Sequence, residues 1–305
     1  MKIDMEKAGR FIHRNARPLD LARWKLSFEN GGRDEVLAAL TAYRNEDGGF
    51  GHALEPDCWN PHSSPIQTWA ATEILRELRP EDGEHPIIRG ILRYLAGGAD
   101  FDGHVWANTV PANNDFPHAP WWSRAADAQP SYNPTASLAG FIVRYARRDD
   151  GVYALGRRLA KEAYDHFQAD YPLEAMHTVA CYVELYEYLQ EAQADDVVDL
   201  PAFRALLERQ IKAVVTYDLR KWPTQYVCRP SLFIRSRGSD FYPVLRELAD
   251  AECRFIAESQ RADGTWDLTW AWGAYPEAWS VAANWWKGDL VVKYARFAAE
   301  FGGEA

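Results

Sequence analysis

Two short segments of the chain repeat one pattern, and each follows the end of an expected helix. Residues 44–50 and 260–266 both read as a polar residue, three residues, glycine, one residue and an aromatic ring. Residues 102–106 are a degenerate third copy. Asp-Gly favours a tight turn, since glycine readily adopts positive φ. The ring then folds back on the helix end. Such repeated units indicate paired helices stacked into a toroid or a solenoid.

Most of the remaining sequence has the apolar spacing of three and four residues that is typical of amphipathic helices. Between Lys2 and Asn30 we expect two helices, divided at Pro18. Further helices are expected over residues 34–43, 65–78, 85–95, 134–147, 152–167, 173–190, 201–215, 241–259, 276–286 and 289–301. About a dozen helices without strand alternation predict an all-α fold. The sequence has no evident linker, so we expect residues 1–305 to form a single domain.

Two stretches, 96–132 and 216–240, interrupt the helical pattern and are rich in aromatic residues. A long loop inside a compact domain is usually functional or disordered. The tryptophans of both loops argue for order. We therefore expect ordered loops folded over the mouth of a cavity.

Charge and cysteine usage limit the class of partner. The formal net charge is -10 at pH 7 and no basic run occurs, which disfavours nucleic acid and anionic membrane surfaces. The first residues lack the apolar run of a signal peptide, and no stretch approaches the roughly 20 apolar residues of a membrane span. Four scattered cysteines are typical of reduced thiols, so we expect a cytoplasmic protein.

The repeated segments resemble motifs of a known superfamily. Gln260 to Trp266 matches the Gln-x-x-x-Gly-x-Trp repeat of squalene and oxidosqualene cyclases. Residues 47–51 look like the Gly-Gly-Phe turn shared by those cyclases and protein prenyltransferase β subunits. The resemblance implies a barrel-like α/α toroid of about six helical hairpins, with long loops at one end. It also implies an enzyme that acts on a hydrophobic, isoprenoid-type substrate in a central aromatic-lined cavity by acid/base chemistry.

The chain departs from the catalytic signatures of that superfamily. The protonating Asp-x-Asp-Asp motif is missing. Residues 195–199 fit the magnesium-binding string Asp-Asp-x-x-Asp, but they are expected in a solvated loop between helices. For a zinc site, the adjacent Asp57 and Cys58 would be a poor pair of ligands, because neighbouring side chains point in different directions. His177 and Cys181 lie four apart on one helix face, where a structural histidine and a core cysteine are the plainer interpretation. We therefore expect no cofactor. Magnesium and zinc are the metal ions to test.

The densest polar cluster of the sequence is residues 47–64. Its candidates for acid/base catalysis are Glu55, Asp57 and His52, and Asp115 from the first long loop joins them. Carboxylates in unlike environments divide acid and base roles, and histidine transfers protons near neutral pH. The alternative is structural, with carboxylates that cap turns and a histidine that is hydrogen bonded.

Aromatic and polar residues of the loops are the candidates for substrate binding, because ligand sites combine an apolar body with few convergent polar groups. These candidates are Trp106, His118, Trp121, Trp122, Tyr132, Trp270 and Trp272. The alternative is that the rings only fill space.

Two other functions fit the same residues. Tryptophan platforms and paired carboxylates, Glu55 or Asp57 with Asp115, are also typical of carbohydrate-active α/α-barrel enzymes, either glycosidases or lyases. A non-catalytic binding module is the second alternative. The expected partner is a small-molecule or oligosaccharide substrate, and the sequence does not indicate an oligomeric state.

Overall fold

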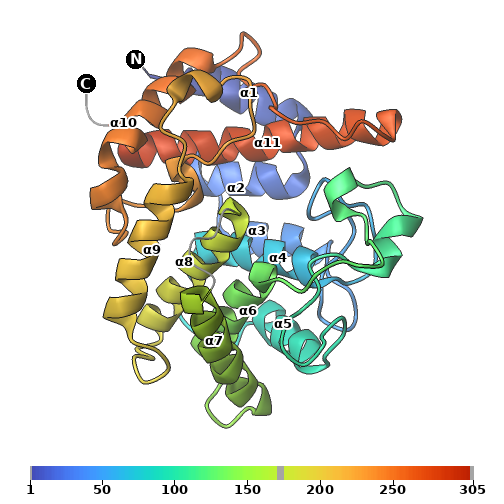
Figure 1. Cartoon of the computed structure of the whole chain (residues 1–305). Coiled ribbons are helices and arrows are strands. Elements are labelled where there is room, and N and C mark those ends of the chain that lie inside the picture. Colours follow the sequence, from blue (N-terminus) through green and yellow to red (C-terminus); the bar gives the residue numbers. More distant parts are fainter. Residues whose placement is uncertain (1, 170–174, 303–305) are drawn as a thin grey trace. The chain divides into compact units, whose positions relative to one another are not determined.

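The computed structural model describes residues 2–169 and 175–302 (Figure 1). Of the chain, 60% is helical, in eleven α-helices and four short 3-10 helices among the described residues. Extended segments of that part of the chain pair only in isolated bridges and form no strand. The all-α class is thereby confirmed. None of the described helices is long and apolar enough to cross a membrane.

The helices group into two compact units, which we describe separately. Unit 1 is discontinuous and contains Met1–Ala42 and Val215–Ala305, whereas unit 2 is the continuous segment Tyr43–Val214. The toroid and the single domain stay predictions.

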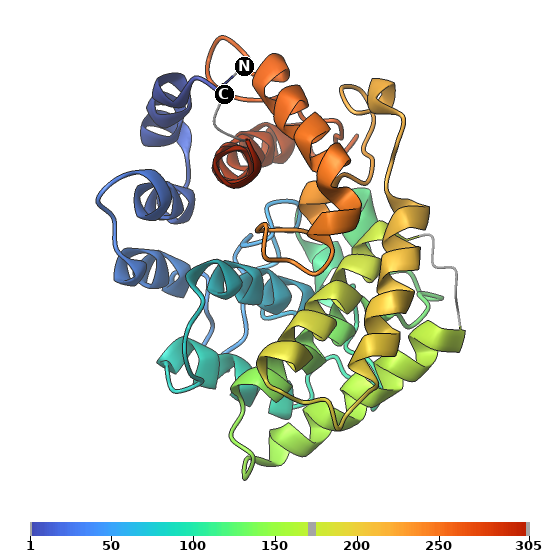
Figure 2. The same cartoon turned by 90° about the vertical axis from the view of Figure 1, so that its left-hand side faces the viewer.

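Helix α11 (Pro276–Phe301) is the centre of unit 1. Figure 2 shows it nearly end-on, with α10 on one side and the N-terminal helices on the other. The other elements are α1 (Met5–Asn15), α2 (Pro18–Phe28), α3 (Arg33–Thr41), α10 (Tyr242–Ser259) and the 3-10 helices η3 (Leu219–Lys221) and η4 (Pro230–Leu232). The expected division at Pro18 is confirmed.

Helix α11 corrects one expectation, because the two helices predicted at 276–286 and 289–301 form one continuous helix. No proline interrupts the junction, so the helix continues through Gly288. A Cβ added at Gly288 would lie 3.3 Å from the Cβ of Ala16. This glycine permits close packing against the segment before α2, and it does not end the helix.

Buried charges join α2 to α11. Nη1 of Arg23 donates to Asp20 Oδ1 at 2.9 Å and to Asp289 Oδ1 at 2.8 Å. Lys293 Nζ lies 2.8 Å from Asp289 Oδ2. Arg23 and Asp20 are almost fully buried. Breaking such a pair on one side is costly, since it leaves an uncompensated buried charge.

In unit 2, α6 (Tyr132–Tyr145) packs against α4, α7 and α8. Gly140 permits the closest approach, because an added Cβ would lie 3.0 Å from the side chain of Tyr188 on α8. The other elements are α4 (Pro65–Leu78), α5 (Pro86–Ala96), α7 (Gly151–Ala169), α8 (Met176–Glu191), α9 (Leu200–Val214), η1 (Pro111–Asp115) and η2 (Pro120–Trp122).

Local signals set the helix boundaries of unit 2. Ser64 accepts a hydrogen bond from the backbone N–H of Gln67, and Pro65 occupies the first helical position of α4. The expected start of α8 at Leu173 lies outside the described residues.

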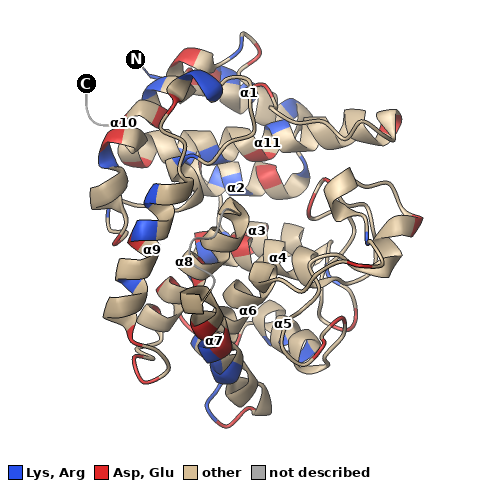
Figure 3. Ribbon diagram, viewed as in Figure 1, with Lys and Arg blue, Asp and Glu red and all other residues tan. Residues whose placement is uncertain are grey.

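Both long loops are confirmed as non-α segments, each with two 3-10 turns. Acidic and basic residues intersperse along exposed faces, as on α7 (Figure 3).

The repeated turns close with the same hydrogen bonds. At residues 44–50, Asn45 N donates to Gly49 O and Gly48 N donates to Asn45 O. At residues 260–266, Arg261 N donates to Thr265 O and Gly264 N to Arg261 O. Asp47 and Asp263, at matching positions, each accept from the second residue beyond. The glycines have φ of 96° and 90°.

Each of these turns also packs its glycine on another helix. A Cβ on Gly48 would lie 2.2 Å from the carbonyl oxygen of Gly90 in α5, and one on Gly264 would lie 2.4 Å from the backbone of Lys7 in α1. Trp266 folds back on α10, where its Nε1 donates to Ile256 O at 2.8 Å. The turn at residues 260–266 therefore connects α10 with α1. Gly103 of the third copy has φ of 104° but no such neighbour.

We expect Gly264→Ala to lower the free energy of unfolding by about 3 kcal/mol, because positive φ and backbone overlap both oppose the methyl group. Gly273→Ala is the matched control, since Gly273 has φ of 71° with nothing within 4 Å of an added Cβ. It should cost only about 1 kcal/mol. Urea denaturation measures both values. Equal losses would show that close packing against Lys7 does not constrain position 264.

We expect Asp289→Asn to destabilise the protein by about 3 kcal/mol at pH 7. Burial raises the pKa of Asp289, but Lys293 and Arg23 outweigh it and hold this pKa well below 3.8. The stabilisation is therefore present above about pH 4 and is lost as the pH falls. Denaturation at pH 7 and pH 3 should show a smaller difference from wild type at pH 3. The exposed Glu277→Gln on the same helix is the control, and a pH-independent difference would contradict the prediction.

Candidate functional site

The structure brings together the two polar clusters that were predicted from distant parts of the sequence. In unit 2, Ala119 N donates to Asp57 O at 2.8 Å, and Trp59 N donates to Pro117 O at 3.0 Å. The ring centroids of His62 and Phe116 are 5.9 Å apart. Residues around positions 57–62 and 116–119 therefore lie side by side.

Asn113 is the polar centre of this junction. Its Oδ1 accepts from Asn60 Nδ2 at 3.0 Å and from Cys58 Sγ at 3.4 Å. Its Nδ2 donates to Trp122 O at 3.0 Å. Burial raises the pKa of the Cys58 thiol to about 12. Cys58 is therefore a protonated core group in this structure.

The four candidates for acid/base catalysis have different environments. Glu55 and Asp57 are buried, and Glu55 Oε1 accepts from Asp57 N at 3.4 Å. His52 is exposed, with φ of 57°, and its Nε2 lies 2.9 Å from Asn45 Oδ1. Asp115 is exposed at the end of η1. Their catalytic role stays a prediction. Because Glu55 and Asp57 are buried, they are better candidates for acid/base catalysis than the exposed His52 and Asp115.

Two candidates for substrate binding form part of the packed interior of unit 2. Trp106 is fully buried against Phe101, with ring centroids 4.8 Å apart. His118 is buried, and its ring nitrogens lie 2.6 Å from Phe116 O and 2.8 Å from Ser123 Oγ. These contacts give both residues a structural role.

The other three candidates in unit 2 are more accessible. The side chain of Trp121 is 46% exposed, and Trp122 is half-buried. Tyr132 lies against His166, with ring centroids 4.7 Å apart. Trp121 is thus the ring that a ligand reaches most easily.

A cavity of about 120 Å³ lies within unit 1, and six of the fourteen residues that line it are aromatic. Trp270, a predicted binding residue, lines it together with the turn residue Trp266. The loop 216–240 contributes Trp222 and Tyr226. This loop therefore lines a cavity, and the expectation that both loops fold over one cavity mouth stays a prediction. Trp272 is instead buried near Trp279, with ring centroids 5.7 Å apart.

Perpendicular ring contacts hold the walls of this cavity. Tyr294 of α11 meets Trp266 edge to face, with centroids 5.1 Å apart. Trp270 meets Tyr226 and Trp286, with both centroid distances 5.4 Å. Such edge-to-face pairs are favourable beyond the area that they bury. These contacts between rings thus stabilise the positions of the cavity walls.

An arginine and a buried carboxylate supply the charge at this cavity. Arg229 lines the cavity, and its Nε lies 3.7 Å from Oε1 of the fully buried Glu252. Arg229 Nη2 also donates to the hydroxyl of Tyr294. Burial raises the pKa of Glu252, and Arg229 and Ser231 oppose this rise. Burial lowers the pKa of Arg229, but Tyr294 and Glu252 outweigh it and leave the pKa above its ordinary value.

The indole N–H of Trp270 adds a second donor. Its Nε1 is buried and has no hydrogen-bond partner among the residues that the structure describes. An unsatisfied buried donor is unfavourable, so an acceptor atom placed there would be stabilised. The residues that line the cavity therefore include aromatic rings, the cation Arg229 and a tryptophan with an unsatisfied donor.

Arg229 and Glu252 were not among the site residues predicted from the sequence. A signal for Glu252 was present, since Leu245, Ala249, Glu252 and Ile256 are spaced as one helical face and all are buried. A charge within such an apolar face marks a residue that needs a partner. Nothing comparable marked Arg229, which lies in an irregular loop.

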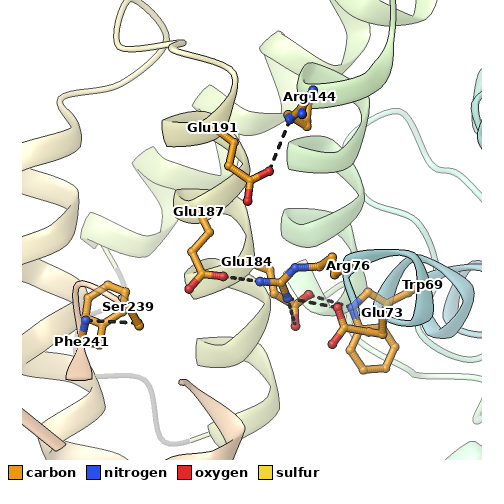
Figure 4. A network of polar contacts seen from close by, with 9 residues as sticks. All are labelled: Trp69, Glu73, Arg76, Arg144, Glu184, Glu187, Glu191, Ser239 and Phe241. Carbon is orange, nitrogen blue, oxygen red and sulfur yellow. Dashed lines mark hydrogen bonds and ion pairs between the residues drawn. The ribbon is translucent and has the colours of Figure 1, made fainter. Parts of the chain in front are cut away.

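A second network, in unit 2, was also missed (Figure 4). Arg76 of α4 contacts Glu73 at 3.2 Å, Glu184 of α8 at 3.5 Å, and Glu187. Trp69 Nε1 donates to Glu184 Oε2 at 2.9 Å. Helical spacing places these residues on facing sides of α4 and α8, so the network joins the two helices.

The metal-like strings have other partners. Asp196 pairs with Arg157 at 2.9 Å, and Asp199 accepts from Ala202 N at the start of α9. Burial raises the pKa of the Cys181 thiol well above its ordinary value, and Cys181 Sγ lies 3.5 Å from Asn133 Oδ1. In the described ranges, 2–169 and 175–302, no group of three His, Cys, Asp or Glu side chains is placed to hold a metal ion.

Comparisons with protein-family models, with curated proteins and with solved structures find no match for this chain. Function is therefore inferred from the site and not from the fold, because one fold supports many activities. The aromatic cavity of unit 1 is the candidate ligand site.

We expect Asn113→Ala to expose the Cys58 thiol, because the variant loses the acceptor that Cys58 and Asn60 share. Labelling with a thiol reagent, followed by mass spectrometry of the peptides, should show at least about tenfold faster modification of Cys58. That factor corresponds to about 1.4 kcal/mol of local opening. Asp115→Asn, an exposed change two residues away, is the control. Unchanged labelling of Cys58 would contradict the role given to Asn113.

Proposed function

We propose that the protein is a terpenoid-cyclase- or prenyltransferase-like enzyme with an α/α-toroid fold, which binds a small isoprenoid-type ligand in the aromatic cavity of unit 1. The observation that carries this proposal is the wall of Trp222, Trp266, Trp270 and Tyr294 around about 120 Å³. An apolar cavity of about 150 Å³ holds benzene. The cavity thus has the size of one five-carbon isoprene unit.

The chemistry of the wall supports an isoprenoid-type ligand. Aromatic faces favour an apolar chain and attract positive charge that develops on it. Arg229 and the Trp270 N–H supply donors for an oxygen-bearing head group. This binding proposal concerns unit 1 alone. Glu55 and Asp57 of unit 2 stay candidates for acid/base catalysis, and the binding proposal assigns them no step at the cavity of unit 1.

A carbohydrate-active enzyme is the second candidate, and one observation favours it. Oε1 of Glu73 and Oε1 of Glu184 lie 3.2 Å and 3.5 Å from the same Arg76 nitrogen, so they are at most 6.7 Å apart, the sum of the two distances. Glycosidase carboxyl groups are about 5–9.5 Å apart. Trp69 beside them would supply a platform for a sugar ring. Arg76, however, pairs with both carboxylates, and a nearby cation favours the charged form of a carboxyl group, which disfavours a general acid.

Calorimetric titration distinguishes the candidates. Prenol (3-methylbut-2-en-1-ol) and 3-methylbut-2-enoate should bind, whereas maltotriose and cellotriose should not. Trp270→Phe keeps the ring but removes the donor, so we expect about fivefold weaker binding, the equivalent of one hydrogen bond of about 1 kcal/mol. Trp279→Phe, outside the cavity wall, should leave Kd unchanged.

Binding of the oligosaccharide alone, lost in Glu184→Gln, would replace the isoprenoid proposal with the carbohydrate proposal. Binding of the five-carbon probes with no turnover of longer prenyl substrates would identify a binding module. Binding of neither class would contradict the assignment of the cavity.

A further inference from the structure

We propose that the cavity of unit 1 receives an anionic head group at Arg229, and that Glu252 takes up one proton as this ligand binds. The inference rests on the proposed function of the cavity. It adds the charge of the ligand and a dependence of affinity on pH.

Arg229 is placed to meet an anion at the cavity. It lines the wall, and its guanidinium lies over the rings of Phe255 and Tyr294, with Cζ 5.3 Å and 5.1 Å from their centroids. Nε faces Glu252 and Nη2 bonds to Tyr294. Trp270 Nε1, on the same wall, is a buried donor without a hydrogen-bond partner within the described part of the chain. Two donors at one cavity suit a carboxylate or a phosphate oxygen.

Glu252 already balances the charge of Arg229. It is completely buried, and it accepts from Ser231 N at 2.9 Å and Ser231 Oγ at 2.6 Å as well as facing Arg229. A bound anion would place two negative charges beside one guanidinium in a site shielded from water. Two like charges cannot both stay ionised at low cost, so one group takes a proton. A ligand carboxylate on Arg229 and Trp270 keeps its charge, and Glu252 is the group that is protonated.

The surrounding groups leave this role to Glu252. Cys228 from the loop and Cys253 from α10 have thiol pKa values raised by burial to about 12 and about 11. Burial also raises the pKa of Tyr294 from α11, near which Lys293 lies. Asp267, at the cavity wall, is paired with Arg261 at 2.6 Å. Between pH 6 and 8.5 the thiols and the phenol therefore stay protonated.

The direction of the pH effect follows. Burial already raises the pKa of Glu252 in the free protein, and a second anion raises it further. The proton comes from solvent, and no bond of the ligand changes. Affinity for an anion is therefore highest at low pH, falls as the pH rises from the pKa of Glu252 in the free protein towards its higher pKa in the complex, and levels off above the latter.

The test compares 3-methylbut-2-enoate with its neutral isostere 3-methylbut-2-enamide between pH 6 and 8.5. We expect Kd of the carboxylate to rise by up to about tenfold per pH unit, the limit for one proton, while Kd of the amide stays constant. Titration in two buffers of different ionisation enthalpy should show uptake of nearly one proton with the carboxylate alone. A monophosphate of the same chain, measured next, distinguishes the two head groups.

Glu252→Gln should abolish the pH dependence for the carboxylate, and Glu258→Gln, exposed on the same helix, should preserve it. The proton-uptake measurement on the unaltered protein decides the question even if Glu252→Gln fails to fold. Binding of both probes without proton uptake, or of the amide alone, would overturn the inference and leave the proposed function standing. Binding of neither probe would remove both.

Discussion

The turn at residues 260–266 fastens the two separated segments of unit 1 to each other. Gly264 lies so close to the backbone of Lys7 that no side chain fits between them. Gln260 Oε1 accepts from Asp4 N at 2.7 Å, and Trp266 donates to the last turns of α10. The same Trp266 ring then forms part of the cavity wall. The shape of the ligand site therefore depends on a contact between the first helix and the end of α10.

Local sequence determined which elements could be predicted. The helices, the division at Pro18 and the two irregular loops follow from apolar spacing, caps and proline, which act over a few residues. The continuity of α11 was missed because Gly288 serves packing against Ala16, a contact from a distant part of the chain. Cys58, Asn60 and Asn113 meet through the same kind of distant contact, which spacing along the chain does not encode.

The site was predicted in part for the same reason. Trp270 and the covering loop were found because aromatic residues in an irregular segment are visible in the sequence. Glu252 and Arg229 define the chemistry of the cavity, yet their pairing joins α10 to a loop more than twenty residues away. Buried ion pairs of this kind contribute little net stability when intact but are costly to break. Their value here is to fix one charged geometry at a cavity whose lining is rich in aromatic residues and largely uncharged.

The discontinuity of unit 1 sets an order for folding during synthesis. Unit 2 is one continuous segment, whereas α1 to α3 must wait for α10 and α11 before unit 1 is complete. At about 5–20 residues per second, the ribosome needs on the order of ten seconds or more to reach α11. During that interval the faces of α1 and α2 that contact α11 lack their partner. A nascent chain thus leaves its first helices unsatisfied until its last ones emerge, which makes this the stage most exposed to misassociation and to chaperone binding.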